Sequence, residues 1–262
     1  MNPTFFQVLI KGVPQTRPED RVGFWSPANS PINWCESDYH HSFYVAELWN
    51  TVTNLAYIVV GIEALLKCRS RRLPLSFGAA AVCTILTGIF SGMFHMSLKY
   101  HWQRLDEVFE NGILIYMLHW STSPPPSALL RGTLHFLVAS LLILTVHSFL
   151  FCEIHLVSTA VLVVLRFRAL AVVSSSSSSS SALSSSSAFH HVRLAGLFAV
   201  FGALAWLVDR TACSAFEGEG RLLPFNPQLH AFGWHVLTSR ALREGFCLMA
   251  MLSDDKTKKK KN

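Results

Sequence analysis

The sequence predicts an all-α fold, a seven-transmembrane helix bundle with a small N-terminal lumenal cap. Of its 262 residues, 51% are hydrophobic and only 15% are charged, and the mean hydropathy is +0.35, which is unusual for a soluble protein of this size. The apolar residues gather in blocks that approach the roughly 20 residues a helix needs to cross a hydrocarbon core. Charged residues, prolines and polar clusters separate these blocks.

Seven blocks qualify as candidate membrane spans. In chain order they are 43–67, 75–96, 105–120, 128–151, 152–173, 192–208 and 230–252. The third is crowded by acidic residues at its start, and Arg166 and Arg168 interrupt the fifth. Short loops join the blocks, so we expect one membrane domain over 43–252, a lumenal cap over 1–42 and a basic cytosolic tail over 253–262.

A polyserine tract separates the fifth and sixth spans. Within 174–187, serine occupies Ser174 to Ser181 and Ser184 to Ser187. Because such a tract cannot bury apolar surface, we interpret it as a flexible linker without a catalytic role.

Basic residues indicate the orientation of the chain. They follow the first span, precede the sixth and end the chain, and all these positions fall on one side of a seven-span protein. The positive-inside rule places that side in the cytosol, so the N-terminus is lumenal and the C-terminus cytosolic. The net charge of +6 then faces acidic lipid headgroups, and we expect no nucleic-acid partner. The terminal lysines fit either a retrieval signal for the endoplasmic reticulum or a simple charge anchor. We expect the protein to reside in the endoplasmic reticulum and/or Golgi.

Ionisable residues cluster at the lumenal ends of three spans. Ser91 and His95 lie four apart near the end of the second span, Asp106 begins the third, and His230 and His235 open the seventh. Such residues are costly inside a membrane and need a partner or a function. Histidines with a carboxylate and one open position suit a catalytic zinc ion, which lowers the pKa of water to about 7 while the carboxylate takes a proton. The pattern predicts hydrolysis.

The remaining histidines and the cysteines have a simpler interpretation. A lone histidine on an apolar helix is more often a packing residue than a ligand, and we assign that role to His119, His135, His147 and His155. Cys35 and Cys213 both fall on the lumenal side, where disulfides persist, so they are able to pair.

Three blocks of sequence resemble the alkaline ceramidases. The first is Asn33-Trp34-Cys35-Glu36, followed by Ala46-Glu47-Leu48-Trp49-Asn50-Thr51. The second runs from Ser91 to Tyr100 and continues with Leu105-Asp106-Glu107. The third combines Trp206 to Asp209 with His230-Ala231 and Trp234-His235. The three blocks follow the order and spacing of the family and together run from residue 24 to about 240.

The resemblance implies a membrane enzyme that hydrolyses the amide bond of ceramide to sphingosine and a fatty acid. It assigns His95, His230 and His235 as zinc ligands, Asp106 as the residue that activates the water, and Ser91 as a group that holds the substrate or the developing oxyanion. It also implies a calcium ion near the zinc, bound by Asn33, Trp34 through its carbonyl, Glu36, Asp38 and Glu47. A bridge from Cys35 to Cys213 would tie the cap to the connection between the sixth and seventh spans.

Two departures from the family pattern affect these assignments. Asn33 stands where the family usually has aspartate, which removes a negative charge and predicts weaker calcium binding. His230 and His235 are five residues apart, whereas the family spaces them by four, which on a regular helix rotates one ring by roughly 100°. A single π-type turn would restore a shared face, and Gly233 would permit it.

Four functions are compatible with these patterns. Hydrolysis of ceramide that enters from the bilayer is the first, with no obligate protein partner expected. The alternatives are a hydrolase of another lipid ester, a seven-helix zinc-containing receptor or pseudoenzyme, and a structural membrane protein without chemistry. A receptor of this class has the opposite orientation, so the charge distribution favours the enzyme.

Overall fold

The computed structural model describes residues 20–122, 124, 127–146, 149–176, 182–216, 222–223 and 225–259. In these residues it contains helices and no strands, which confirms the predicted all-α class. The elements are α2 (Leu48–Thr53), α3 (Leu55–Arg71), α4 (Leu75–Ser97), α5 (Tyr100–Thr122), α6 (Ser127–Val146), α7 (Phe149–Ser176), α8 (Ala182–Thr211), η1 (Cys213–Ala215), η2 (Leu229–His235) and α9 (Val236–Lys259).

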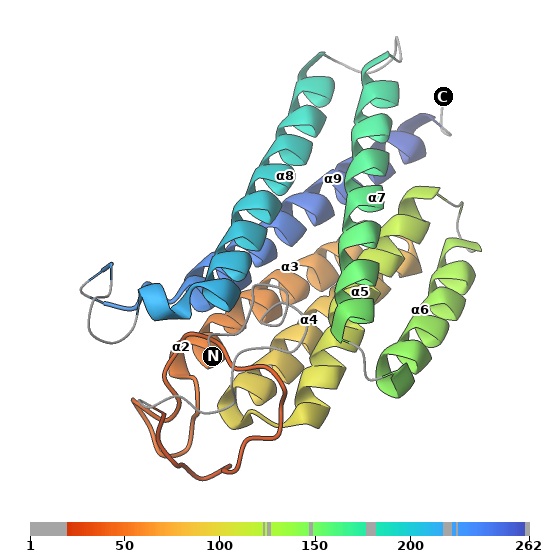
Figure 1. Cartoon of the computed structure of the whole chain (residues 1–262). Coiled ribbons are helices and arrows are strands. Elements are labelled where there is room, and N and C mark those ends of the chain that lie inside the picture. Colours follow the sequence, from red (N-terminus) through yellow and green to blue (C-terminus); the bar gives the residue numbers. More distant parts are fainter. Residues whose placement is uncertain are drawn as a thin grey trace.

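The helices form one bundle (Figure 1). Helix α4 packs against α3 and α5, α5 packs against α6 and α7, α7 packs against α8, and α8 packs against α9, which returns to α3. Large apolar side chains are exposed along α6, α7 and α8, including Leu137, Leu165 and Phe201. Such surfaces suit contact with lipid rather than with water.

Five helical segments are long and apolar enough to cross a membrane. They are Leu48–Arg71, Leu75–Ser97, Ser127–Thr145, Cys152–Val173 and Ser186–Thr211. Helices α5 and α9 are not among these five segments. Helix α5 carries buried charged residues near its start, and α9 contains several charged residues along its length. Five segments therefore support the membrane character by their length and composition, and the seven-span count stays a prediction.

Several predicted boundaries need correction. Helix α5 begins at Tyr100 rather than at residue 105, because Leu98 takes a left-handed conformation (φ 52°) that ends α4 and lets the next helix start at once. Helix α9 continues through Lys259, so most of the predicted tail is helical. The predicted break between spans at 151 and 152 lies earlier, between Val146 and Phe149.

The serine linker predicted for 174–187 is too broad. Helix α7 continues through Ser176 and α8 begins at Ala182, because serine costs a helix only about a few tenths of a kcal/mol relative to better helix formers and the flanking helices extend into it. Residues 177–181 lie outside the described part of the chain.

An N-terminal segment, residues 20–47, crosses the end of the bundle where α4 ends and α5 begins (Figure 1). The backbone N–H groups of Ala46 and Glu47 donate to the carbonyls of Met96 and His95, at 2.9 and 3.0 Å. Ile32 and Trp34 pack with Phe94 and Leu98 in a buried cluster. Residues 1–19 of the predicted cap lie outside the described residues, and the lumenal position of this segment stays a prediction.

A disulfide joins Cys35 to Cys213 across 178 residues of sequence. It connects the N-terminal segment to η1, directly after α8. The predicted pairing is confirmed.

Candidate metal and catalytic site

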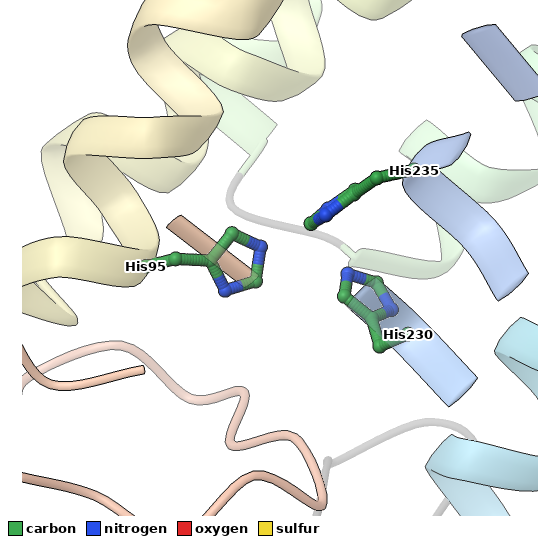
Figure 2. A group of neighbouring side chains, drawn as sticks. All are labelled: His95, His230 and His235. Carbon is green, nitrogen blue, oxygen red and sulfur yellow. The ribbon is translucent and has the colours of Figure 1, made fainter. Parts of the chain in front are cut away.

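Three buried histidines meet at the end of the bundle that the N-terminal segment covers. His95 comes from α4, and His230 and His235 come from η2. One ring nitrogen of each lies within 4.8 Å of the others, and all three side chains are buried. Figure 2 shows the rings facing a common space, His95 from one side and the other two from the opposite side. Such a set is able to hold a metal ion.

The five-residue spacing of His230 and His235 is accommodated by a π-helix. Element η2 has π-helical hydrogen bonding over the whole of Leu229–His235, which widens the turn and brings His230 and His235 to a ring-centroid distance of 4.6 Å. The predicted π-turn is confirmed. At Gly233 a Cβ would lie 2.3 Å from the Cβ of Ala205, so α8 approaches the π-helix closely at this residue. That Gly233 permits the π-turn stays a prediction.

Hydrogen bonds fix the orientation of two of the three imidazoles. Nδ1 of His95 lies 2.5 Å from the Glu47 carboxylate. Because a carboxylate can only accept a hydrogen bond, Nδ1 of His95 carries the hydrogen. Nδ1 of His235 lies 2.9 Å from Oγ1 of Thr53, whose hydroxyl donates its one hydrogen to the Trp49 carbonyl at 2.8 Å. With its hydrogen on that carbonyl, Thr53 would accept Nδ1–H from His235. Nδ1–H on both rings would leave Nε2 free for a metal ion, which is the usual arrangement of a histidine ligand.

His230 is held from two other directions. Its ring stacks on Trp34 with a centroid distance of 3.5 Å, and its backbone N–H donates to Asp209 at 3.2 Å. The other carboxylate oxygen of Asp209 accepts from the backbone N–H of Cys35 at 3.0 Å. Asp209 thus connects the disulfide to the first turn of η2.

Asp106 and Ser91 line one cavity with the three histidines. Ser91 lies one turn before His95 on α4, and its hydroxyl bonds the carboxyl group of Asp106 on α5. The neighbouring Glu107 lines the same cavity, but it accepts from Gln103 at 2.7 Å and pairs with Arg104. Of the two consecutive acids, Asp106 is therefore the one that bonds Ser91.

The residues predicted to bind calcium all lie in the N-terminal segment. Asn33, Trp34, Glu36, Asp38 and Glu47 are each at most 5% exposed. The carboxylate of Glu36 accepts the backbone N–H groups of Trp49 and Asn50 at 2.7 and 2.8 Å, at the start of α2. Burial nevertheless raises the pKa of Glu36 to about 7, so a bound cation would stabilise its ionised form. Glu47 also contacts His95, so a residue predicted to bind calcium touches one predicted to bind zinc.

Asp20 is a residue of this segment that the sequence did not single out. Its carboxylate accepts from Nδ2 of Asn33 at 3.2 Å and from the backbone N–H of Asp38 at 3.0 Å. It thus supplies a negative charge next to the position where Asn33 lacks one.

Thr53, Asp20 and Asp209 contribute to the site without being predicted as part of it. Thr53 and Asp20 carry no signal in their local sequence, because each acts on a residue that is distant along the chain. Asp209 belongs to the third block of sequence that resembles the family, so the resemblance pointed to its position but not to its contact with His230.

The packing histidines join three helices. Nε2 of His119 lies 3.3 Å from His135, whose other nitrogen lies 3.2 Å from His155, and Nδ1 of His155 bonds Oδ1 of Asn111 at 2.6 Å. These contacts link α5, α6 and α7, in agreement with a structural role. His147 lies outside the residues whose side chains are described.

Comparison with known proteins identifies the family. The sequence profile of the family described as Ceramidase matches residues 26–262. Alkaline ceramidase 3 of Mus musculus is 30% identical over 239 residues, which cover 84% of this chain and 82% of that protein. Alkaline ceramidase YPC1 of Saccharomyces cerevisiae is 29% identical over 86% of this chain and 77% of its own, and alkaline ceramidase of Arabidopsis thaliana is 25% identical over 82% and 81%. The chain therefore belongs to the ceramidase family of enzymes.

Proposed function

We propose that the protein hydrolyses the amide bond of ceramide to sphingosine and a fatty acid at a zinc site formed by His95, His230 and His235. The observation that carries this proposal is the π-helix, because it brings His230 and His235 together despite a spacing that a regular helix would not tolerate. A chain that had lost its metal would have no need of this local geometry.

The donor set fits zinc. Three neutral imidazoles are borderline ligands that zinc accepts readily, and the protonated Nδ1 atoms of His95 and His235 direct Nε2 into the shared space. When bound there, zinc supplies Lewis-acid activation of water and of the amide carbonyl.

Asp106 and Ser91 supply the proton transfers and polar contacts. The carboxylate of Asp106 accepts the proton of the attacking water and then returns it to the amide nitrogen, so that the amine leaves neutral. Ser91 donates its one hydroxyl hydrogen to the Asp106 carboxylate. Once Asp106 has taken the proton of the water, that hydrogen would be free to turn to the oxygen on which negative charge develops.

Calcium binding in the N-terminal segment is part of the same proposal. The ligands are Asn33, the Trp34 carbonyl, Glu36, Asp38 and Glu47, with the carboxylate of Asp20 beside them. Oxygen ligands of this kind suit calcium. Because Glu47 also bonds His95, occupancy of the calcium site would stabilise the orientation of that imidazole.

Substitutions at Asp20 and Asn33 are expected to shift calcium affinity in opposite directions. Asp20→Asn removes a charge and should weaken calcium binding about tenfold, whereas Asn33→Asp adds one and should strengthen it by a similar factor, since charge count tunes calcium sites. The measurement is the calcium concentration that half-maximally raises the Tm of the purified protein. An unchanged midpoint in Asp20→Asn would remove Asp20 from the site.

We propose seven spans with a lumenal N-terminus and a cytosolic C-terminus in the endoplasmic reticulum and/or Golgi. Helices α5 and α9 would be the two spans of lower apolarity, with their acidic and basic groups directed to the bundle interior or the cytosol. The disulfide supports a lumenal segment, because disulfides persist in that compartment.

The decisive experiment is ceramide hydrolysis by the detergent-purified protein at alkaline pH with calcium. We expect activity, one zinc per chain by elemental analysis, loss of activity on chelation, and recovery on adding zinc. A folded, calcium-loaded protein that contains no zinc and releases no sphingosine would contradict the proposal and favour a receptor or pseudoenzyme.

A further inference from the structure

The outer face of the N-terminal segment carries large apolar side chains. Val22, Phe24, Phe43 and Tyr44 are 82%, 56%, 58% and 64% exposed. Two stretches of chain bring them together, since the backbone N–H of Phe24 donates to the Phe43 carbonyl at 2.8 Å. The centroid of the Tyr44 ring lies 5.7 Å from that of Phe24 and 5.4 Å from that of Phe43. We call these three aromatic residues, with Val22 two residues before Phe24, the aromatic patch.

The surface around the aromatic patch exposes a cation but no acid. The acidic residues within 20–47, a stretch that the structure describes throughout, are Asp20, Glu36, Asp38 and Glu47. The last three are at most 5% exposed, and Asp20 is partly buried and accepts from Asn33 and Asp38. Arg21 is exposed, and its guanidinium reaches the His40 carbonyl at 3.4 Å. Aromatic rings beside a cation, without a competing acid, suit phospholipid headgroups with their anionic phosphates.

The aromatic patch continues an apolar stripe on the first candidate span, Leu48–Arg71. Exposed large apolar residues recur along this span at intervals of three or four, at Trp49, Val52, Leu55, Val59, Ile62 and Leu66. Such intervals place them on one face of a helix, which is the face available to lipid. The stripe begins at Trp49, whose ring centroid lies 5.9 Å from that of His41, two residues before Phe43. The lipid-facing surface therefore extends from α3 onto the N-terminal segment.

This continuity favours the bilayer as the occupant of the aromatic patch. The segment lies at the end of the bundle from which α2 and α3 start (Figure 1), so the leaflet that surrounds the start of the span adjoins it. Phenylalanine and tyrosine rings suit the boundary between the membrane and water, where the apolar body is buried and the tyrosine hydroxyl stays hydrated. A patch of this kind left in water would be an association site.

We propose that the aromatic patch inserts into the bilayer leaflet at the histidine end of the bundle and anchors the N-terminal segment to the membrane surface. The same segment contributes Ile32 and Trp34 to the lining of the cavity that holds the three histidines. Anchoring the segment would keep the cavity level with the headgroup region, so that a lipid passes between leaflet and cavity without crossing water. The insertion itself depends on neither the metal nor the substrate.

Photo-crosslinking to lipid tests the insertion directly. Benzoylphenylalanine, which bonds to nearby C–H groups on illumination, is introduced in place of Phe24 or Phe43 in the full chain, reconstituted in phosphatidylcholine vesicles. We expect a phosphatidylcholine adduct on the protein by mass spectrometry at both positions. Phe201, exposed on α8, is the positive control, and Arg71, at the far end of α3, is the negative control. The yield at Phe24 and Phe43 should exceed that at Arg71 by at least about fivefold, because acyl chains lie at the depth of the aromatic belt.

Two other results would overturn the insertion. One is the absence of a lipid adduct at residues 24 and 43 in a preparation where residue 201 gives one. The other is an adduct to protein in place of lipid, either to a second copy of the chain or to residues 1–19, which would show that protein covers the aromatic patch.

An activity measurement tests the role in lipid access, and this arm alone rests on the proposed function. The double variant Phe24→Ser with Phe43→Ser should hydrolyse ceramide in vesicles about tenfold more slowly than the wild type, because membrane affinity scales with the apolar area inserted. Its rate in detergent micelles, where no leaflet has to be reached, should be unchanged, and Phe201→Ser should match the wild type in both. An equal loss in vesicles and micelles would contradict a role in access. If neither protein hydrolyses ceramide, the proposed function fails while the lipid adduct still decides the insertion.

Discussion

Replacing Asp106 with asparagine is expected to lower kcat for ceramide hydrolysis by about a thousandfold while leaving zinc content unchanged. Asparagine has nearly the same shape and still accepts a hydrogen bond from Ser91, but it cannot take a proton from water. Sphingosine release and zinc per chain, measured on the same preparation, give the two quantities.

Glu107→Gln is the informative companion to that variant. Glu107 lies next to Asp106 in sequence but is engaged with Gln103 and Arg104, so its replacement should lower the Tm more than it lowers kcat. If the Asp106 variant kept most of its activity while Glu107→Gln lost it, the roles of the two acids would be reversed.

The second large effect is expected for His235→Ala, which should lose both zinc and activity. The variant keeps two imidazoles, and a catalytic zinc site ordinarily needs three protein ligands. Zinc per chain should fall well below one after dialysis, and hydrolysis should drop at least about a thousandfold. Elemental analysis therefore tests the metal assignment independently of the lipid assay.

His135→Ala serves as its control. His135 is a partly buried histidine within the bundle, and its partners are His119 and His155 rather than residues of the site. It should retain zinc, with a lower Tm from the lost contacts between helices. Full zinc content and activity in His235→Ala would exclude His235 from the metal site.

The sequence predicted the helical class and much of the site because those features have local signals. Apolar blocks marked five of the spans. The π-turn was predicted because His230 and His235 are five residues apart where the family that the sequence resembles has four. Helix ends were harder to place. Leu98 ends α4 through a left-handed conformation that has no distinctive sequence signal, so the start of α5 was predicted five residues late.

Contacts between distant residues account for the rest of what the sequence did not reveal. Thr53 is 182 residues from His235, and Asp20 meets Asn33 and Asp38 only because the N-terminal segment folds back on itself. Residue type alone predicts none of these pairings, since each depends on how two elements approach.

The disulfide between Cys35 and Cys213 has a consequence for biosynthesis. The bond cannot form until the chain through residue 213 has been made, which is 178 residues after the first cysteine and on the order of 10 to 40 seconds at ordinary rates of translation. His230 and His235 emerge later still. Until then only its contacts with α4 can hold the N-terminal segment in place. Covalent closure over the three histidines is therefore among the last steps of maturation.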